Sequence, residues 1–160
     1  MNIDGKTRLL GLLGDPVEHT MSPVIHNTLS DVLGFNEVYV PFHTTSEGLK
    51  NAVKGAYDLN ILGMNATVPH KNAVIDMLVD IDAGAKAIGA VNTLVRVEGG
   101  YKGYNTDMMG LSRELDVYGI SLKERNAVIL GAGGAARAVA YMCAAKGCKK
   151  VFVLLSLIHI

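Results

Sequence analysis

The chain has 160 residues, of which 49% are hydrophobic, and its 15 basic residues balance its 15 acidic residues. This length is typical of one domain, or of one domain with part of another. The zero net charge argues against a nucleic-acid-binding protein, which would need a basic surface. No apolar run in the sequence is long enough to span a membrane.

The two cysteines, Cys143 and Cys148, have no second pair of metal ligands, and the histidines show no metal-binding spacing. We therefore expect free thiols and no metal site. The apolar run from Leu9 to Leu13 is too short for a signal peptide, so we expect none. Together these features indicate a reducing compartment, the cytoplasm.

The first predicted strand, Arg8 to Gly14, is apolar throughout, which is typical of strands buried on both faces of a parallel sheet. Ser22 and Pro23 then suit an N-cap and a first helical residue. The residues that follow have the spacing of an amphipathic helix, which ends at Gly34. Its apolar positions are Ile25, Leu29, Val32 and Leu33.

Two further strand–helix units follow, and then a short helix and a hairpin. Ser46 is the predicted cap of the second helix, and Pro69 opens the third. The strands are predicted at residues 37–42, 60–66, 90–97 and 101–104, and the short helix at 83–89. The inward residues are Leu49, Ala52, Val53, Ala56 and Tyr57 in the second helix and Val74, Ile75 and Leu78 in the third. This order predicts an α/β domain with a mostly parallel sheet and at least one antiparallel strand.

The residues from Asn65 to Lys71 lie at the predicted carboxyl end of the third strand. They present an amide, a hydroxyl and an ammonium group at the sheet edge where open α/β folds bind their ligands. The alternative interpretation is an ordinary connecting loop with a surface lysine. The rest of the chain favours the first interpretation.

A connector helix at about 108–118 and a buried strand at 127–130 precede a run that reads Gly-Ala-Gly-Gly-Ala-Ala from Gly131 to Ala136. The run fits the pattern G-x-G-x-x-A between a strand and a helix, which is typical of dinucleotide-binding folds. Gly131 permits a tight turn, Gly133 lets a pyrophosphate approach the backbone, and the helix N-terminus supplies N–H donors. The helix is predicted to run to Lys146 and to end at Gly147, and its inward residues are Ala135, Ala138, Val139 and Met142.

Taken together, five segments in this order resemble the shikimate/quinate dehydrogenase family. They are residues 14–23, 65–71, 90–93, 103–107 and 131–136. The resemblance implies an α/β fold with a mostly parallel substrate-binding domain at 1–107. It assigns 108–160 to a connector helix and the incomplete start of a Rossmann NAD(P)-binding domain.

The resemblance implies an enzyme that reversibly reduces 3-dehydroshikimate to shikimate with NADP, or with NAD as the alternative, in aromatic amino-acid biosynthesis (the chorismate pathway). The catalytic residues that it implies are Lys71 and Asp107. The substrate-binding residues are Thr20, Ser22, Thr67 and Asn92, and the cofactor-binding residues are Gly131, Ala132, Gly133, Gly134 and Ala135. Partners beyond the small-molecule substrate are not implied, and neither nucleic acid nor a membrane is expected.

The chemistry agrees with this assignment, because oxidising an alcohol by hydride transfer requires a group that takes the hydroxyl proton. Lys71 is the candidate general base. A base needs a lowered pKa near neutrality, whereas a neighbouring carboxylate such as Asp107 raises the pKa of a lysine. Lys71 and Asp107 therefore act either as a coupled pair or with Lys71 mainly orienting the reacting oxygen.

Each of the other residues also has a structural interpretation. Thr20 is a polar loop residue, Ser22 is a helix cap, Asn92 closes a turn, and Asp107 is an N-cap for the helix after it. We interpret His70 and the other histidines as structural or surface residues.

Three features depart from the family. The first hydroxyl position is Thr20, where serine is usual, and Met108 follows Asp107, where glycine is common. After the last predicted strand, 151–155, the chain has no charged residue to select NAD or NADP. The apolar tail at 156–160 indicates a truncation or an out-of-frame terminus.

We therefore expect this chain to be catalytically weak or inactive. We also expect a homodimer, or a domain-swapped one, formed through residues 126–160, because a partial Rossmann domain leaves an apolar face uncovered. A non-catalytic regulatory module that binds shikimate or quinate is the alternative function. Retention of both Lys71 and Asp107 favours the enzyme. A different Rossmann dehydrogenase is disfavoured by the four upstream motifs.

Overall fold

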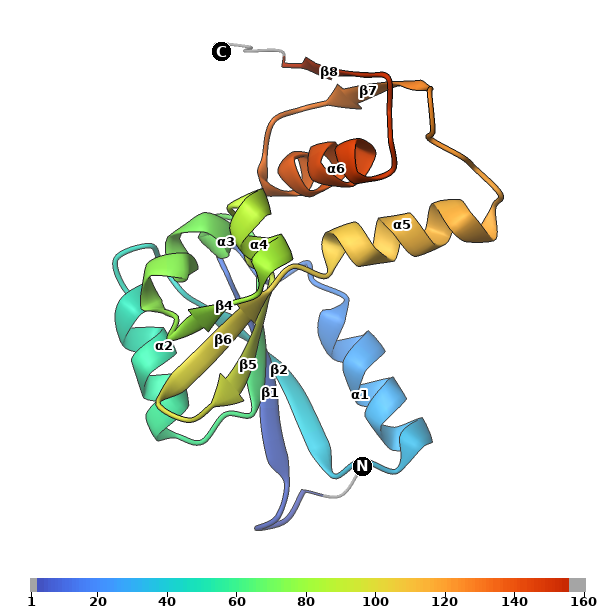
Figure 1. Ribbon diagram of the computed structural model, residues 1–160. Coiled ribbons are helices and arrows are strands. Elements are labelled where there is room, and N and C mark those ends of the chain that lie inside the picture. The colour runs from blue at the N-terminus through green and yellow to red at the C-terminus, as the bar shows by residue number, and fades with distance from the viewer. Residues whose placement is uncertain (1–2, 156–160) are drawn as a thin grey trace. The chain divides into compact units, whose positions relative to one another are not determined.

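The computed structural model describes residues 3–155 (Figure 1). Its residue contacts divide the chain into two compact units. Unit 1 comprises Met1–Asp82 and Val91–Tyr104, and unit 2 comprises Ala83–Ala90 and Asn105–Ile160. The prediction assigned all of residues 1–107 to the first domain. The contacts instead place Ala83–Ala90, which contains the short predicted helix, in unit 2. The assignment of the units as substrate-binding and dinucleotide-binding domains stays a prediction.

Unit 1 is built on one sheet, which we call the large sheet. Within residues 3–155 its strand order is β2-β1-β3-β5-β6-β4. The strands are β1 (Arg8–Gly14), β2 (Glu37–His43), β3 (Gly63–Ala66), β4 (Asp80–Ile81), β5 (Thr93–Val97) and β6 (Gly100–Tyr104). Strand β1 pairs in parallel with β2 and β3, whereas β5 runs antiparallel to both β3 and β6. The predicted strands and hairpin are present, and β4 is an unpredicted addition.

The N-caps of the first two helices of unit 1 lie one and two residues away from the predicted caps. They are α1 (Ser22–Leu33), α2 (Leu49–Asp58), α3 (His70–Ala73) and the 3-10 helix η1 (Val74–Met77). The prediction of Ser22 as an N-cap is wrong, because the Thr20 hydroxyl already accepts the Ser22 N–H and Ser22 is the first helical residue. The predicted cap Ser46 is also wrong. Gly48 holds that position, and its N–H donates to the Thr45 hydroxyl.

One part of the core of unit 1 lies between the large sheet and α2, and another is the cluster of Leu12, Val17 and Tyr39. Leu49, Val53 and Ala56 are buried, as the helical spacing predicts. The third predicted helix is present but changes from α3 to η1 at Val74, which is fully buried. It ends at Leu78, whose extended backbone leads into β4.

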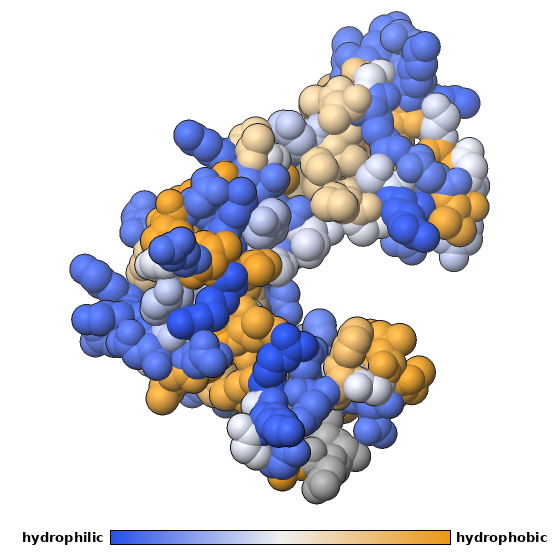
Figure 2. All heavy atoms as spheres, turned by 60° about the horizontal axis from the view of Figure 1, so that its bottom comes forward, coloured by the Kyte–Doolittle hydropathy of each residue, from blue (hydrophilic) through white to orange (hydrophobic). Residues whose placement is uncertain are grey.

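Helix α1 turns its apolar stripe outward. The stripe consists of Ile25, Leu29, Val32 and Leu33, which are 50–76% exposed. Figure 2 shows apolar side chains gathered over this helix. The predicted amphipathic helix is thus present, but its polar face meets the sheet, because the Asn27 amide bonds both the N–H and the carbonyl oxygen of Tyr39 in β2 (2.8 and 2.9 Å).

Unit 2 contains a small sheet, in which β7 (Asn126–Leu130) and β8 (Lys150–Leu154) run parallel. Its helices are α4 (Ala83–Ile88), α5 (Asp107–Val117) and α6 (Gly134–Ala145). Ile88, Ala90 and Ala138 form a buried cluster with Met108 against it. The prediction that Ala135 faces inward is wrong, since Ala135 is exposed and the inward stripe of α6 is Ala138, Met142 and Cys143.

One face of the small sheet is exposed to solvent within residues 3–155. It carries Val128 and Leu130 of β7 beside Phe152 and Leu154 of β8, which pair in that register and are all exposed. None of the helices in residues 3–155 is long and apolar enough to cross a membrane. The predicted tail at 156–160 lies outside the described residues.

Candidate functional site

Main-chain hydrogen bonds hold three of the predicted site residues at the carboxyl edge of the large sheet. Thr67 directly follows Ala66, the last residue of β3. The Asn92 carbonyl oxygen accepts the N–H of Ala66 (3.0 Å), and the Lys71 carbonyl oxygen accepts the N–H of Val91 (2.8 Å). Thr67, Lys71 and Asn92, which are separate in the sequence, are therefore tied to the same edge.

Strand β1 approaches this edge very closely. The N–H of Thr67 donates to Leu13 (2.9 Å), and a Cβ atom added to the buried Gly14 would lie 2.5 Å from Cγ2 of Thr67. Only a residue without a side chain leaves Thr67 its present rotamer. Gly14 therefore belongs to the site through packing.

The loop before α1 contributes two hydroxyl groups. The Thr20 hydroxyl donates to the Ser22 hydroxyl (3.1 Å) and accepts the Ser22 N–H (3.2 Å). Both side chains are half-buried. The two hydroxyls are thus held as a hydrogen-bonded pair.

A chain of side-chain hydrogen bonds connects Tyr39, which also interacts with Ser22 of this pair, with Asn92. The Tyr39 hydroxyl donates to Asn65 Oδ1 (2.8 Å), and the Asn65 amide donates to the Asn92 carbonyl oxygen and the Thr93 hydroxyl (3.2 Å each). The Thr93 hydroxyl donates to Asn92 Oδ1 (2.9 Å). Burial raises the pKa of Tyr39 to about 12, and a hydrogen bond with Ser22 offsets part of this. We call Ser22, Tyr39, Asn65, Thr93 and Asn92 the polar chain.

The roles of Tyr39 and Thr93 were not predicted, and Asn65 was noted only as an amide in the loop. A usable signal was present at Asn65, because a polar residue stands between the buried Met64 and Ala66 in a short apolar strand. Such a residue needs a hydrogen-bond partner inside the protein.

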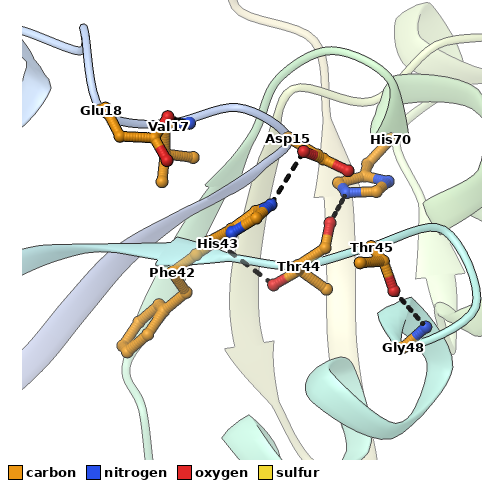
Figure 3. A network of polar contacts seen from close by, with 9 residues as sticks. All are labelled: Asp15, Val17, Glu18, Phe42, His43, Thr44, Thr45, Gly48 and His70. Atoms are coloured by element: carbon orange, nitrogen blue, oxygen red, sulfur yellow. Dashed lines mark hydrogen bonds and ion pairs between the residues drawn. The ribbon is translucent and has the colours of Figure 1, made fainter.

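His70, the residue before Lys71, is held in place by a hydrogen bond to Thr44 (Figure 3). Its side chain is fully buried, and Nε2 lies 2.6 Å from the carbonyl oxygen of Thr44, so Nε2 carries the proton. Its Nδ1 atom has no hydrogen-bond partner among the described residues. On the outer side of the same loops, His43 Nε2 lies 2.8 Å from Asp15 Oδ1. His70 is thus structural, as predicted, and it anchors the turn that carries Lys71.

In unit 2, Asp107 opens α5. The interpretation of Asp107 as an N-cap is wrong, because Thr106 holds the cap position and Asp107 is the first helical residue. Its N–H donates to Asn105 Oδ1 (3.1 Å), and the buried Asn105 amide donates to the Ala90 carbonyl oxygen (3.0 Å). Asn105, which had no predicted role of its own, therefore positions Asp107. A carboxylate in the first turn is also favoured by the helix dipole.

The glycine-rich run has the backbone that a phosphate-binding turn needs. Gly131 has φ of 107°, which favours glycine, and Gly133 stands at the N-cap of α6. A Cβ atom at either position would meet no described atom within 4 Å. Ala132 and Gly133 are exposed and Gly134 is half-buried. The turn is thus open to an incoming pyrophosphate. Residues 3–155 hold no cluster of side chains suited to a metal ion.

The predicted residues divide between the units. Lys71 lies in unit 1 with all four predicted substrate-binding residues, whereas Asp107 and the run from Gly131 to Ala135 lie in unit 2. A mostly parallel sheet with polar groups at its carboxyl edge, followed by a glycine-rich strand–turn–helix, is typical of the class of α/β folds that bind ligands at this edge and dinucleotides at such a turn.

Comparison with known proteins identifies the family within this class. The family model described as the shikimate dehydrogenase substrate binding domain matches residues 12–94, and the chain belongs to this family. The resemblance and the fold class predicted from the sequence are thereby confirmed.

The curated relatives are named accordingly. The chain is 50% identical over 140 residues to shikimate dehydrogenase (NADP(+)) of Methanococcus maripaludis, which covers 87% of this chain and 50% of the relative. The crystal structure of shikimate dehydrogenase from Aquifex aeolicus matches with a TM-score of 0.93 and 41% identity, over 98% of this chain and 58% of that one.

A shikimate 5-dehydrogenase from Listeria monocytogenes, in complex with shikimate and NAD, matches with a TM-score of 0.91 and 34% identity. The match covers 99% of this chain and 55% of the Listeria chain. The chain thus spans about half the length of the curated relatives that it matches.

Proposed function

We propose that this chain is the substrate-binding part, with the start of the cofactor-binding part, of an NADP-dependent shikimate dehydrogenase. The reaction is the reversible reduction of 3-dehydroshikimate to shikimate in aromatic amino-acid biosynthesis. The observation that carries the proposal is the polar chain with Thr20 and Thr67 at the carboxyl edge of the large sheet, inside the segment that matches the family model. NADP is supported by the name of the Methanococcus relative, and the NAD in the Listeria structure makes NAD the alternative.

The substrate is a carboxylate with ring hydroxyls, and the proposed site offers a group for each part. The paired hydroxyls of Thr20 and Ser22 bind the carboxylate, and Thr67 and Asn92 bind ring hydroxyls. Hydroxyl and amide groups suit this task because they donate and accept hydrogen bonds alike. The polar chain supports Asn92, since Asn65 bonds both the Tyr39 hydroxyl and the Asn92 carbonyl oxygen.

Lys71 is the proposed general base in the oxidation of shikimate and the general acid in the reverse direction, with Asp107 as its partner carboxylate. Bound NADP would supply the hydride acceptor, and Lys71 would take the proton of the substrate hydroxyl. Lys71 is held by the main-chain bond to Val91 and by the buried His70 beside it. Asp107 is held by Asn105.

The run from Gly131 to Ala135 is the proposed pyrophosphate site. The open backbone at Gly131 and Gly133 supports this role. On its own, the 160-residue chain is proposed to bind shikimate but to be catalytically weak or inactive.

A calorimetric titration of the chain with shikimate and with quinate tests the proposal. Lys71→Ala is expected to weaken shikimate binding at least tenfold, whereas Lys50→Ala, at an exposed lysine of α2, leaves it unchanged. Asp107→Ala should likewise weaken shikimate binding, and Asp58→Ala, at an exposed aspartate of α2, is its control. Far-UV circular dichroism confirms that each variant is folded. Failure of the folded chain to bind either acid contradicts the proposed function.

The uncovered face of the small sheet supports a homodimer. Val128, Leu130, Phe152 and Leu154 present a continuous apolar surface, and such surfaces on soluble domains usually mark an interface. Light scattering over a range of concentrations is expected to show dimers. Leu130→Glu should give monomers, whereas the control Leu59→Glu, at an equally exposed leucine of unit 1, should not. A clean monomer of the unaltered chain at high concentration contradicts this.

The cytoplasm is the proposed location, because the family's reaction is biosynthetic and both cysteines are free thiols.

A further inference from the structure

The C-terminal end of α6 brings the two cysteines of the chain together. Gly147 has φ of 76°, the left-handed conformation in which helices commonly end. The N–H of Gly147 donates to the Ala144 carbonyl oxygen (3.1 Å), and the N–H of Cys148 donates to the Cys143 carbonyl oxygen (3.0 Å). These two bonds define a Schellman motif.

In this motif the side chains at the two ends of the longer bond commonly contact each other across the helix end. Here both positions are cysteines. A direct main-chain hydrogen bond keeps the two backbones close, and a disulfide needs Cα atoms about 4.4–6.8 Å apart. Burial raises the pKa of the Cys143 thiol, and the charge of Cys148 and a hydrogen bond with it raise it further, which is consistent with adjacent thiols.

The two thiols differ in their access to solvent. Cys143 is 3% exposed, within the inward stripe of α6, whereas Cys148 is half-buried at the exit of the helix. A reagent therefore reaches Cys148 first. Cys143 reacts only with a group that is already attached to its neighbour.

We propose that Cys143 and Cys148 form a dithiol site that closes to an intrachain disulfide by exchange with a small-molecule disulfide. The Cys148 thiolate attacks one sulfur of the reagent, the S–S bond of the reagent breaks, and one thiolate leaves. The Cys143 thiolate then attacks Sγ of Cys148 and expels the second half of the reagent. Two protein thiols are oxidised, one disulfide is reduced to two thiols, and their protons are conserved.

The position of this site gives the closure a structural consequence. Cys148 lies two residues before β8, and Cys143 lies on the face of α6 that packs inside unit 2. The disulfide would fasten the end of α6 to the segment that enters the small sheet. It lies at the opposite end of α6 from the Gly131 turn, so the proposal does not depend on the proposed function.

The test is incubation of the full 160-residue chain with oxidised glutathione under native conditions, followed by intact mass spectrometry after acid quenching. The expected product has lost two hydrogen atoms, carries no glutathione, and does not react with N-ethylmaleimide after denaturation. Cys143→Ser should stop at one glutathione on Cys148, and Cys148→Ser should react at least tenfold more slowly. Circular dichroism of both variants confirms the fold.

Gly147→Ala tests the geometry separately, because alanine is strained at this φ while both thiols remain. Formation of the mixed disulfide at Cys148 should continue, and its closure should slow several-fold. A stable mixed disulfide on the unaltered chain, or a disulfide that forms only between two chains, overturns the proposal. Dithiothreitol should return the starting mass.

Discussion

Unit 1 and unit 2 are built from the same kind of element, an apolar strand that turns into a helix. They differ in how completely the apolar side chains of these elements are buried. In unit 1, α2 covers the large sheet, and side chains such as Leu49 and Val74 have no exposed surface. In unit 2, α6 covers one face of the small sheet, and Leu130 on the other face is 82% exposed. An apolar strand pattern therefore predicts that a sheet face needs to be buried, but it does not predict which element buries it.

Unit 1 also buries more polar groups than unit 2. Ser30, Thr44, His70 and Asn92 are buried in unit 1, whereas Asn105 is the one such residue in the described part of unit 2. Buried polar groups persist only where hydrogen bonds satisfy them. Unit 1 therefore has the rigidity that a hydrogen-bonding site requires.

The largest expected effect comes from truncating one leucine in each unit. Leu49→Ala should lower the free energy of unfolding by about 2–5 kcal/mol, because it leaves a cavity under α2. Leu130→Ala should change it by less than about 0.5 kcal/mol, since that side chain is exposed. Urea unfolding followed by circular dichroism measures both, in dilute solution where the chain is monomeric. Equal losses would break the contrast between the units.

Gly14→Ala should damage the proposed substrate site at the carboxyl edge of the large sheet. The added methyl group lies against Cγ2 of Thr67, so Thr67 must rotate and turn its hydroxyl away. Overpacking of this kind costs about 1–3 kcal/mol, and shikimate binding should weaken at least tenfold. Gly55→Ala in α2 is the control, because a Cβ there meets no described atom within 4 Å. Calorimetric titration compares the two, and unaltered binding by Gly14→Ala would remove Thr67 from the site.

Tyr39→Phe should change how stability depends on pH. The pKa of Tyr39 rises from 10.0 to about 12 on folding, so the folded chain holds the phenol proton more tightly than the unfolded chain. This stabilisation is complete below pH 10 and is lost as the pH rises toward 12, by about 3 kcal/mol. The unfolding free energy of Tyr39→Phe should fall less steeply over this range. Tyr118→Phe, at an exposed tyrosine, should keep the original slope.

The smallest effect separates two glycines within unit 2. Both lie where a Cβ meets no described atom within 4 Å, but Gly131 has φ of 107° and Gly133 has φ of −74°. Gly131→Ala should therefore lower stability by about 1–2 kcal/mol through backbone strain, and Gly133→Ala should leave it nearly unchanged. Thermal unfolding measures this. Equal shifts would show that φ at Gly131 is not constrained.

The parts of the fold that could be predicted from the sequence are those encoded within a few neighbouring residues. The apolar run of β1, the spacing of α2 and the turn at Gly131 each lie in one short segment. The direction in which α1 faces could not be predicted, because an apolar stripe on a helix shows only that one side avoids water. It points outward here because Asn27 on the opposite side bonds to β2.

The candidate site shows the same limit. Thr20, Ser22, Thr67, Lys71 and Asn92 were found through motifs, and the structure ties them to one unit. Tyr39 and Asn65 were missed as connecting residues because they meet across 26 positions of sequence. No local pattern encodes such a contact, since it arises only from the strand register.

The paired hydrogen bonds of Asn27 have a further consequence for the outer margin of the large sheet. Strand β2 is the terminal strand on that side, and terminal strands offer free main-chain groups to which strands of other molecules can add. By occupying both the N–H and the carbonyl oxygen of Tyr39, the Asn27 amide imitates one residue of a neighbouring strand. The Asn27 side chain thus blocks the addition of another strand at the middle of the edge strand β2, and with it aggregation by this route.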